Sequence, residues 1–334
     1  MAATEAAAGG GRIVVADPMH PAGLELLVAA GYEVVECPPR ERLDASLEQA
    51  VALIVRTATP VDADRLAAAA RLRVIGRAGV GIDHIDTEAA GRRGVVVVNT
   101  PDANTVSAAE HTVALLLATV RQLGARDAEL KRGEWSRGTL RGLELSGRVL
   151  GIVGLGRIGS AVALRLRAFG MRVLANDPYI GAERFAAFGV EPVESLPEMV
   201  ERSQVLTIHT PLDSGTRGLL SAQVLARLPV GAVVLNAARG GLVDESALLE
   251  LLERGHVWGA GIDVFEQEGL ASAAAEHFRH SVSARLAAHP RVVASPHVGA
   301  YTEQAQERMS VQVAEAVLAA LASAPTVPAR APSS

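Results

Sequence analysis

The sequence predicts an α/β protein built from two doubly wound parallel sheets with helices on both faces. Short apolar runs alternate with helical patterns along nearly the whole chain, which is typical of repeated strand–helix units. The runs are apolar at consecutive positions, as expected for strands that are buried on both faces. The chain has 334 residues, more than a single hydrophobic core usually holds, so we expect two domains.

The first series of strand–helix units occupies the N-terminal part of the chain. Ala- and Leu-rich segments with helix-start signals separate its strands, and Asp62 is a typical N-cap before one of them. The five candidate strands lie at Ile13–Val15, Val34–Val35, Leu53–Val55, Val74–Ile75 and Val95–Val98.

The longest helical pattern, residues 105–123, follows this series. Its apolar residues cover much of the helix circumference, which predicts burial between the domains or against a partner. A second series begins at Val149, and its apolar runs lie at residues 149–154, 172–177, 204–211, 232–238, 259–265 and 292–296. A final helix, Glu303–Ala322, precedes a tail rich in Pro, Ala and Ser that we expect to be disordered.

Composition and charge argue against several classes of protein. A hydrophobic content of 49% with 21% charged residues is typical of a soluble globular protein. The net charge of -5 disfavours a general nucleic-acid binder. Because Cys37 is the single cysteine and no HExxH motif occurs, we expect neither an internal disulfide nor a bound metal. The N-terminus lacks a signal-peptide pattern and no apolar stretch reaches the roughly 18 residues of a membrane span, which predicts a cytoplasmic protein.

A glycine-rich turn opens the second series. Gly154, Gly156 and Gly159 form a G-x-G-x-x-G between a strand and a helical pattern, which is the context of a dinucleotide fingerprint. The glycines let the backbone approach a pyrophosphate, and the start of the helix, with Arg157 and Ile158, offers N–H groups and a positive dipole end. The alternative is an ordinary glycine turn. A P-loop is disfavoured because no Lys-Ser/Thr pair follows the glycines.

The next strand ends at Asp177, 18 residues after Gly159. A carboxylate at this position can accept hydrogen bonds from both ribose hydroxyls of an adenosine and would repel a 2′-phosphate. The sequence therefore favours NAD over NADP as the cofactor.

Polar residues follow three later strands of the second series. Arg239 comes after one strand, Glu268 after the next, where Asp263 lies just inside the end, and His297 after the last. Taken singly, they could be a surface arginine, a solvated acidic turn and a core histidine. Because parallel strands end at one edge of a sheet, we expect them to lie near the glycine loop.

The chemistry of these groups is complementary. An arginine binds a carboxylate through two parallel hydrogen bonds. A histidine can take a proton from a hydroxyl or return it to a ketone, and a nearby carboxylate orients an imidazole and stabilises its charged form. With a nicotinamide close by, the set suits hydride transfer between a 2-hydroxy acid and a 2-oxo acid.

At this point the chain resembles the D-isomer-specific 2-hydroxyacid dehydrogenase family, and within it the D-3-phosphoglycerate dehydrogenases. The resemblance runs from Val14 to Ala316. It rests on the motifs VRTATPV (55–61), IGRAGVGIDHID (75–86), VVNTPDANTVSAAEHT (97–112), GIVGLGRIG (151–159), NAARGGLVDE (236–245), GIDVFEQE (261–268) and SPHVGA (295–300).

The resemblance implies two Rossmann-like lobes with a cleft between them that closes by a hinge motion. The NAD-binding domain would comprise residues 102–296, inserted into a substrate-binding domain of residues 1–101 and 297–334. It also implies a homodimer. The chain ends without the C-terminal regulatory domain of some relatives, so feedback regulation of that kind is not expected.

Residue roles follow from the same resemblance. Arg239 matches the arginine that binds the substrate carboxylate, Glu268 the acid paired with histidine, and His297 the general acid/base. The expected cofactor-binding residues beyond the glycine loop and Asp177 are Thr210, Pro211, Ala237 and Asp263, with Asp263 matched to the nicotinamide carboxamide. The expected substrate-binding residues are Ala78, Gly79, Val80 and Gly81, whose backbone would bind the carboxylate, and Arg56 and Arg77, with Arg137 as a third basic candidate near a substrate phosphate.

Three departures from the family pattern bear on the substrate. Gly269 stands where proline usually follows the acid, the segment 269–291 is extended, and Tyr301 replaces a usual serine. The expected substrate is D-3-phosphoglycerate with 3-phosphohydroxypyruvate, and hydroxypyruvate, glyoxylate or another acidic 2-oxo acid remain alternatives. A corepressor-like NAD-sensing scaffold is the alternative from another class. A formate-dehydrogenase-like reaction is disfavoured, because those relatives have glutamine in place of Glu268.

Overall fold

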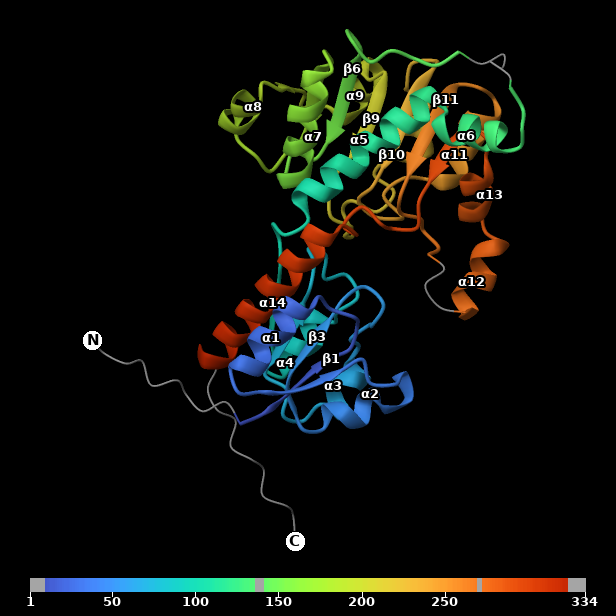
Figure 1. Cartoon of the computed structure of the whole chain (residues 1–334). Helices are drawn as coiled ribbons and strands as arrows, with labels where there is room; N and C mark the ends of the chain where they lie inside the picture. Colours follow the sequence, from blue (N-terminus) through green and yellow to red (C-terminus); the bar gives the residue numbers. More distant parts are fainter. Residues whose placement is uncertain (1–9, 136–140, 269–271, 324–334) are drawn as a thin grey trace. The chain divides into compact units, whose positions relative to one another are not determined.

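The computed structural model describes residues 10–135, 141–268 and 272–323. They form two compact units. Unit 1 holds the described residues up to Asn104 and from Tyr301 onward, and unit 2 is Thr105–Ala300. Each unit contains one parallel sheet (Figure 1), which confirms the predicted fold class.

Unit 1 is built on a five-stranded sheet of order β2-β1-β3-β4-β5. Every neighbouring pair is parallel, and the strand order reverses between β1 and β3, which is the switch point of a doubly wound sheet. The strands are β1 (Arg12–Val15), β2 (Glu33–Glu36), β3 (Ala50–Val55), β4 (Val74–Arg77) and β5 (Val96–Asn99), each overlapping a predicted strand.

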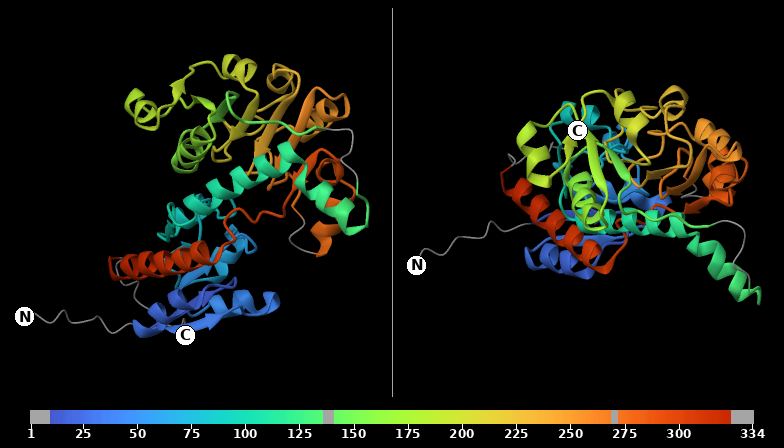
Figure 2. Two further views of the ribbon diagram at one scale, coloured as in Figure 1. Left: turned by 45° about the horizontal axis from the view of Figure 1, so that its top comes forward. Right: turned by 90° about the horizontal axis from the view of Figure 1, so that it is seen from above.

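Helices cover both faces of this sheet. α1 (Pro21–Ala29) and the final helix α14 (Glu303–Ser323) lie side by side on one face (Figures 1 and 2). The helices α2 (Arg40–Leu47), α3 (Ala63–Ala68) and α4 (Thr87–Arg92) supply Leu43, Leu66 and Ala90 to the core on the other face. Asp62 caps α3 as predicted, by accepting the N–H of Arg65 at 2.9 Å. The end of the chain therefore completes the unit that its beginning starts.

Unit 2 contains a seven-stranded parallel sheet of order β12-β11-β10-β9-β6-β7-β8. Its switch point lies between β6 and β9. The strands are β6 (Val149–Val153), β7 (Arg172–Asn176), β8 (Glu191–Pro192), β9 (Val205–Ile208), β10 (Ala232–Asn236), β11 (Val257–Ile262) and β12 (Val292–Ala294). The short strand β8 had no apolar run to predict it.

The helices of unit 2 cover both faces of its sheet. One hydrophobic core takes its helical residues mainly from α5 (Thr105–Arg121) and α7 (Arg157–Ala168), and α6 (Leu123–Lys131) follows α5. The opposite core takes them from α9 (Leu196–Arg202), α10 (Ala222–Leu225), α11 (Glu245–Glu253) and α13 (Val282–Ala288). The remaining helices are α8 (Ala182–Phe188) and α12 (Ser272–Arg279).

Two expectations about the helices need correction. The pattern at 105–123 is not one helix, because Gln122 adopts a left-handed backbone with φ of 52° and separates α5 from α6; α14, with 21 residues, is longer than α5 with 17. The apolar circumference of α5 is explained within unit 2, because Leu115, Leu116 and Val120 pack into the core beside α7 and the sheet.

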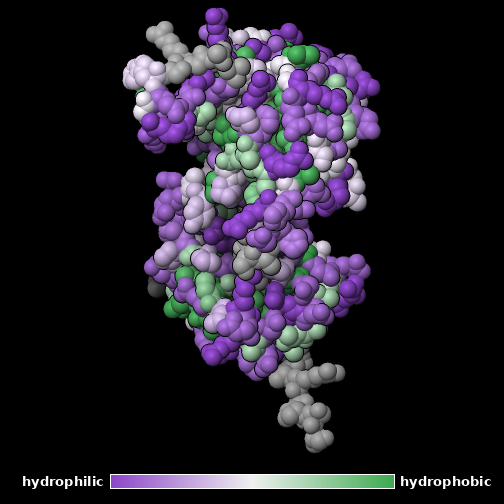
Figure 3. All heavy atoms as spheres, turned by 90° about the vertical axis from the view of Figure 1, so that its right-hand side faces the viewer, coloured by the Kyte–Doolittle hydropathy of each residue, from purple (hydrophilic) through white to green (hydrophobic). Residues whose placement is uncertain are grey.

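One face of the described surface is mainly polar. The face in Figure 3 is mostly hydrophilic, with hydrophobic residues in small scattered groups. Within residues 10–135, 141–268 and 272–323, no helix has both the length and the apolar character needed to cross a membrane.

The helices α1 and α14 of unit 1 are in close contact. Gly23 of α1 donates its N–H to Ser310 Oγ of α14 at 3.1 Å, and Ser310 Oγ donates to the carbonyl of His20 at 2.6 Å. A Cβ at position 23 would lie 2.2 Å from Ser310 Oγ and 2.3 Å from its carbonyl oxygen. Only glycine allows the two helices to approach this closely.

We expect Gly23→Ala to lower the stability of unit 1 by about 2–3 kcal/mol, because the new methyl group forces α1 and α14 apart. Native-state hydrogen exchange of the β4 amides measures this free energy. Gly91→Ala in α4 is the matched control, since a Cβ there meets no atom within 4 Å, and it should be neutral or stabilising by up to about 1 kcal/mol. Equal stabilities of the two variants would contradict the prediction.

Candidate active site

The residues expected to bind and react follow successive strands of the unit 2 sheet. Because these strands are parallel, their carboxyl ends meet at one edge. Along the strand order β12-β11-β10-β9-β6-β7, the residues that follow each strand are His297, Glu268, Arg239, Thr210, Gly154 and Asp177. Five steps between neighbouring strands span roughly 24 Å, so the edge forms an extended row with an acid–base pair at one end and an acidic residue at the other.

The glycine loop is tightly built at the switch point. Gly154 has φ of 88°, and a Cβ there would lie 2.9 Å from Thr210 Cγ2. A Cβ on Gly159 would lie 2.1 Å from the carbonyl oxygen of Gly154, whereas one on Gly156 meets no atom within 4 Å. Gly154 and Gly159 therefore serve the packing of the loop, and Gly156, the N-cap of α7, leaves its outer side open.

Asp177 and Arg184 brace this loop. The backbone N–H of Leu155 donates to Asp177 Oδ2 at 2.9 Å, and the N–H of Tyr179 donates to Oδ1 at 3.0 Å. The Arg184 guanidinium donates to the Leu155 carbonyl at 3.0 Å and to Ser160 Oγ at 3.2 Å. Asp177 is thus fixed beside the glycine turn, and Arg184 is a supporting residue that the sequence reasoning missed.

The loop after β9 fits a bound dinucleotide. Among the described residues, Thr210 Oγ1 and His209 Nδ1 are buried atoms without a hydrogen-bond partner, and the Thr210 methyl group and the His209 backbone lie beside Gly154. Burial lowers the pKa of His209 to about 4, so its imidazole is neutral at physiological pH. Together with the open side of Gly156 and the first turn of α7, these groups suit a ligand that supplies polar atoms.

His297 and Glu268 form a close pair. His297 Nδ1 lies 3.0 Å from both Glu268 Oε1 and Oε2, with side chains 28% and 24% exposed. When the carboxylate accepts the Nδ1 proton, Nε2 remains available for a second partner. His297 has a left-handed backbone with φ of 54°, which is unfavourable for a residue with a side chain and requires the surrounding structure to hold it.

Asp263 holds the backbone that carries His297. Its carboxylate accepts N–H groups from Val298 and Gly299, each at 2.9 Å, and its carbonyl accepts the N–H of His297 at 2.7 Å. The side chain is 1% exposed. Burial alone would raise the pKa of Asp263, but hydrogen bonds from His111, Ser295 and the Val298 N–H bring it below its ordinary value. The cofactor contact expected for Asp263 stays a prediction.

Two partners of Asp263 escaped the sequence reasoning. Ser295 Oγ donates to Asp263 Oδ1 at 2.6 Å. His111 Nε2, from α5, lies 2.9 Å from Ser295 Oγ and 3.2 Å from Asp263 Oδ1. Because the serine proton goes to the carboxylate, Nε2 must be the donor to the serine oxygen. Both residues lie in motifs of the family pattern, but only the folded chain brings them together.

Arg239 lies in a loop that packs against the segment leading to Glu268. Asn236 Nδ2 donates to the Arg239 carbonyl at 2.8 Å, and the Arg239 guanidinium donates to the Ala238 carbonyl at 2.7 Å. A Cβ on Gly240 would lie 1.9 Å from the Phe265 carbonyl oxygen. Of the other expected cofactor residues, Arg157 and Ile158 start α7, Pro211 follows Thr210, and Ala237 follows β10.

A cavity of about 510 Å³ opens beside the acid–base pair. Its wall includes His297 and Glu268 on one side and apolar side chains elsewhere, with Arg279 of α12 also present. The apolar lining comes from Phe265, Phe278, Ala287, Ala294 and Pro296. Phe265 and Phe278 pack edge to face with ring centroids 6.0 Å apart. The pair therefore borders a partly apolar space within unit 2.

The expected substrate-binding residues belong to unit 1, where Arg56 follows β3 at the switch point. Its N–H donates to Asp17 Oδ2 at 2.6 Å, and its guanidinium lies 5.9 Å from the centre of the Tyr301 ring. Burial lowers the pKa of Arg56, although Tyr301 and Asp17 partly oppose this. The structure thus places Tyr301, noted as a departure from the family, beside one of the candidate arginines.

Arg77 and the loop after β4 form a second group in unit 1. Arg77 is 9% exposed and donates to the Ala78 carbonyl at 2.6 Å and to Thr57 Oγ1 at 3.2 Å. Gly79 has φ of 143°, and a Cβ there would collide with the Arg77 guanidinium. Val80 is held through its carbonyl, which accepts from Asn99 Nδ2 at 2.7 Å, and Gly81 follows it. Arg77 therefore shapes the loop expected to bind the substrate carboxylate.

Some expectations fall on undescribed parts of the chain. Arg137, Gly269 and the C-terminal tail lie outside the described residues. In the part of the chain that the structure does describe, no group of three or more His, Cys, Asp or Glu residues is arranged to hold a metal ion.

The fold and the edge of the unit 2 sheet define a dinucleotide-binding α/β protein, with the glycine loop at the switch point and an acidic residue on the next strand. Residues 113–299 match the family model described as D-isomer specific 2-hydroxyacid dehydrogenase, NAD binding domain. The chain belongs to this family, as its motifs predicted, and these residues form the family's NAD-binding domain.

The chain aligns with individual relatives over most of its length. It is 45% identical to a D-3-phosphoglycerate dehydrogenase of Mycobacterium bovis over 93% of this chain and 57% of the relative, so it spans little more than half the length of that protein. Among solved structures, it is similar to the TT0316 protein of Thermus thermophilus, with 37% identity, a TM-score of 0.83 and coverage of 94% and 98% of the two chains. An NADPH-dependent glyoxylate/hydroxypyruvate reductase of Sinorhizobium meliloti shows 31% identity, a TM-score of 0.80 and 94% coverage of both.

We expect Gly156→Ala to fold like the parent protein but to bind NADH about tenfold or more weakly, because a methyl group would occupy the open side of the loop. Gly159→Ala should lower both the melting temperature and NADH affinity, since its Cβ collides with Gly154. Differential scanning calorimetry and NADH fluorescence titration measure the two effects. Unchanged NADH affinity in Gly156→Ala would show that this loop does not contact the cofactor.

Proposed function

We propose that the chain is an NAD-dependent dehydrogenase that interconverts a D-2-hydroxy acid and its 2-oxo acid. The observation that carries this proposal is the His297–Glu268 pair, with 3.0 Å separations, on the sheet edge that also holds the glycine loop. Residues 102–296 are the proposed NAD-binding domain, and residues 1–101 with 297–334 the proposed substrate-binding domain. The compact unit Thr105–Ala300 and the family match at 113–299 support a division close to this one, although both include His297 in the NAD-binding part.

The residues of the chain divide the reaction between them. His297 Nε2 accepts the proton of the substrate hydroxyl during oxidation and returns it to the carbonyl oxygen during reduction. Glu268 orients the ring and stabilises the imidazolium, while Arg239 binds the substrate carboxylate. Accepting a hydride in oxidation, and donating one in reduction, is the chemistry that NAD supplies when bound.

The proposed substrate is D-3-phosphoglycerate with 3-phosphohydroxypyruvate. The name of the Mycobacterium bovis relative supports it, as do the two arginines of unit 1, Arg56 and Arg77, which with Ala78–Gly81 are the proposed substrate-binding residues. Hydroxypyruvate or glyoxylate is the second candidate, favoured by the likeness to the Sinorhizobium meliloti reductase and by Tyr301 beside Arg56.

We also propose a cytoplasmic homodimer. Large apolar side chains are exposed at Leu123, Leu130 and Trp135, in and just after α6, with Trp135 89% exposed. Exposed apolar side chains of this size can bury surface against a second copy of the chain. The proposed partners are otherwise small anionic 2-hydroxy and 2-oxo acids, with no nucleic acid and no membrane.

A panel of 2-oxo acids tests the proposal directly. NADH oxidation is followed with 3-phosphohydroxypyruvate, hydroxypyruvate, glyoxylate and pyruvate, and the highest kcat/KM is expected for the phosphorylated acid. A higher value for hydroxypyruvate or glyoxylate would favour the second candidate. Tight NADH binding without turnover of any member would overturn the enzymatic proposal in favour of a scaffold.

We expect His297→Ala to lower kcat by roughly 10²–10⁴-fold, because proton transfer loses its acid and base. NADH affinity should be unchanged, as measured by fluorescence titration. His280→Ala, which removes an exposed histidine paired with Glu276 at the surface, is the matched control and should retain the parent kcat. Near-normal turnover by His297→Ala would remove it from the acid–base role.

Asp177→Ala should weaken NADH binding by about 10–100-fold, because charge-assisted hydrogen bonds of about 1.5–3 kcal/mol are lost. NADPH binding should fall much less, since the carboxylate that repels a 2′-phosphate is also gone. Isothermal titration with both nucleotides gives the comparison. Equal losses for NADH and NADPH would contradict the role of Asp177 in selecting NAD.

A further inference from the structure

The position of Glu268 depends on bonds made by neighbouring backbone groups. Glu268 lies beyond β11, outside any helix or strand, so no regular hydrogen-bond ladder fixes it. Its carboxylate must nevertheless lie close to His297, where both oxygens are 3.0 Å from Nδ1. The segment that leads from β11 to Glu268 is therefore the support on which the pair depends.

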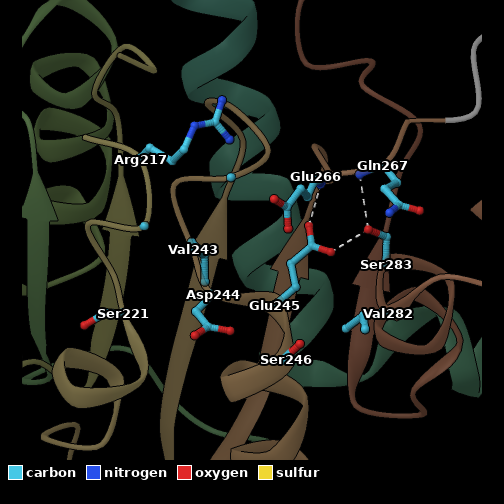
Figure 4. Close-up of a pocket in the computed structure, with 12 residues that line it drawn as sticks. Arg217, Ser221, Val243, Asp244, Glu245, Ser246, Glu266, Gln267, Val282 and Ser283 are labelled. Carbon is cyan, nitrogen blue, oxygen red and sulfur yellow. Dashed lines mark hydrogen bonds between the residues drawn. The ribbon is translucent and has the colours of Figure 1, made fainter. Parts of the chain in front are cut away.

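A buried glutamate on α11 holds this segment. The backbone N–H of Glu266 donates to Glu245 Oε1 at 2.7 Å, and Glu245 is 6% exposed. Ser283 Oγ donates to the second oxygen, Oε2, at 2.5 Å. Figure 4 shows the Glu245 carboxylate between the Glu266 backbone and the Ser283 side chain.

Ser283 also holds the next residue of the segment, Gln267. The backbone N–H of Gln267 donates to Ser283 Oγ at 3.3 Å. A chain of hydrogen bonds thus runs in one direction, from the Gln267 N–H to the serine oxygen and from the serine hydroxyl to Glu245. The two residues immediately before Glu268 are both tied, one directly and one through Ser283.

The surroundings of Glu245 also favour a supporting role for its side chain. Burial raises the pKa of the Glu245 carboxyl, and hydrogen bonds from Ser283 and the Glu266 N–H oppose that effect. A group whose folded-state pKa is raised is stabilised in its neutral form, so replacing it by the neutral, isosteric glutamine should not unfold the chain. The carboxylate borders a cavity of about 340 Å³ away from His297, so its role in the reaction would be indirect.

We propose that Glu245 and Ser283 are positioning residues that set the place of the Glu268 carboxylate beside His297. Ser283 belongs to α13, so this helix of the extended part of the chain would act on the acid–base pair indirectly, through the backbone before Glu268. This inference rests on the proposed function, because it concerns the acid of the acid–base pair. It assigns roles to two residues outside the expected catalytic, cofactor-binding and substrate-binding sets.

Variants with matched controls test the inference. Glu245→Ala and Ser283→Ala remove the acceptors, whereas Glu245→Gln and Ser283→Thr keep an acceptor at each position. Ser246→Ala is the control, since Ser246 lines the same cavity and is exposed. Ser283→Ala should fold even where Glu245→Ala does not, because alanine is favourable in a helix.

Three measurements should change together in the alanine variants. Hydrogen exchange at the Glu266 amide in Glu245→Ala, and at the Gln267 amide in Ser283→Ala, should be about tenfold faster. The kcat for reduction should fall about tenfold, with NADH affinity unchanged. The rate of reduction falls as the pH rises, because the histidine must be protonated to act as the acid. In the alanine variants this fall should begin at a lower pH than in the parent, because the imidazolium loses its ion partner. The glutamine, threonine and control variants should stay close to the parent.

Different results would overturn this inference and the proposed function. Unchanged exchange and kcat in Ser283→Ala would overturn the inference, as would a fall in kcat without a shift of the pH profile. Equal losses in Ser283→Ala and Ser283→Thr would also overturn it. If the parent protein turns over no 2-oxo acid, the proposed function fails, and the amide exchange rates alone decide whether Glu245 and Ser283 hold the segment.

Discussion

The parallel direction of the unit 2 strands is the constraint on which the rest of this protein depends. It brings segments from six strand ends to one edge, although they are scattered from residue 154 to residue 297. The reversal of strand order between β6 and β9 then opens the switch point at which the glycine loop sits. No local sequence feature could gather these groups, so the register of the sheet is itself part of the site.

Glu268 and His297 lie outside the helices and strands, so hydrogen bonds to buried carboxylates hold the backbone there. Asp263 holds the left-handed turn that carries His297, and Glu245 holds the segment before Glu268. Each carboxylate is almost fully enclosed and accepts backbone N–H groups that would otherwise be unsatisfied. Such bonds have strict geometric requirements, so they fix irregular backbone more firmly than apolar packing alone would do.

Local signals in the sequence predicted the fold class, the strands except β8 and the glycine loop, because each depends on a few adjacent residues. The pairing of Glu268 with His297, 29 residues apart, was expected from the family motifs instead. Other features depend on contacts that a linear reading does not contain. His111 and Ser295 are 184 residues apart, and Ser283 and Glu245 are 38 apart. The break at Gln122 was missed because the apolar pattern continues through it while the backbone turns left-handed. Arg77 matched a substrate position, yet its burial against its own loop became visible only in the fold.

The return of α14 to the first sheet has a consequence for synthesis. Val313 and Val317 of α14 pack against Gly76 of β4, so the part of the unit 1 sheet around β4 stays uncovered on that face until the chain has been made almost to residue 323. Unit 2 is continuous and can fold as soon as it leaves the ribosome. Unit 2 can therefore fold before unit 1, although the first strands of unit 1 are translated earlier. Those strands keep apolar surface exposed until α14 has been made.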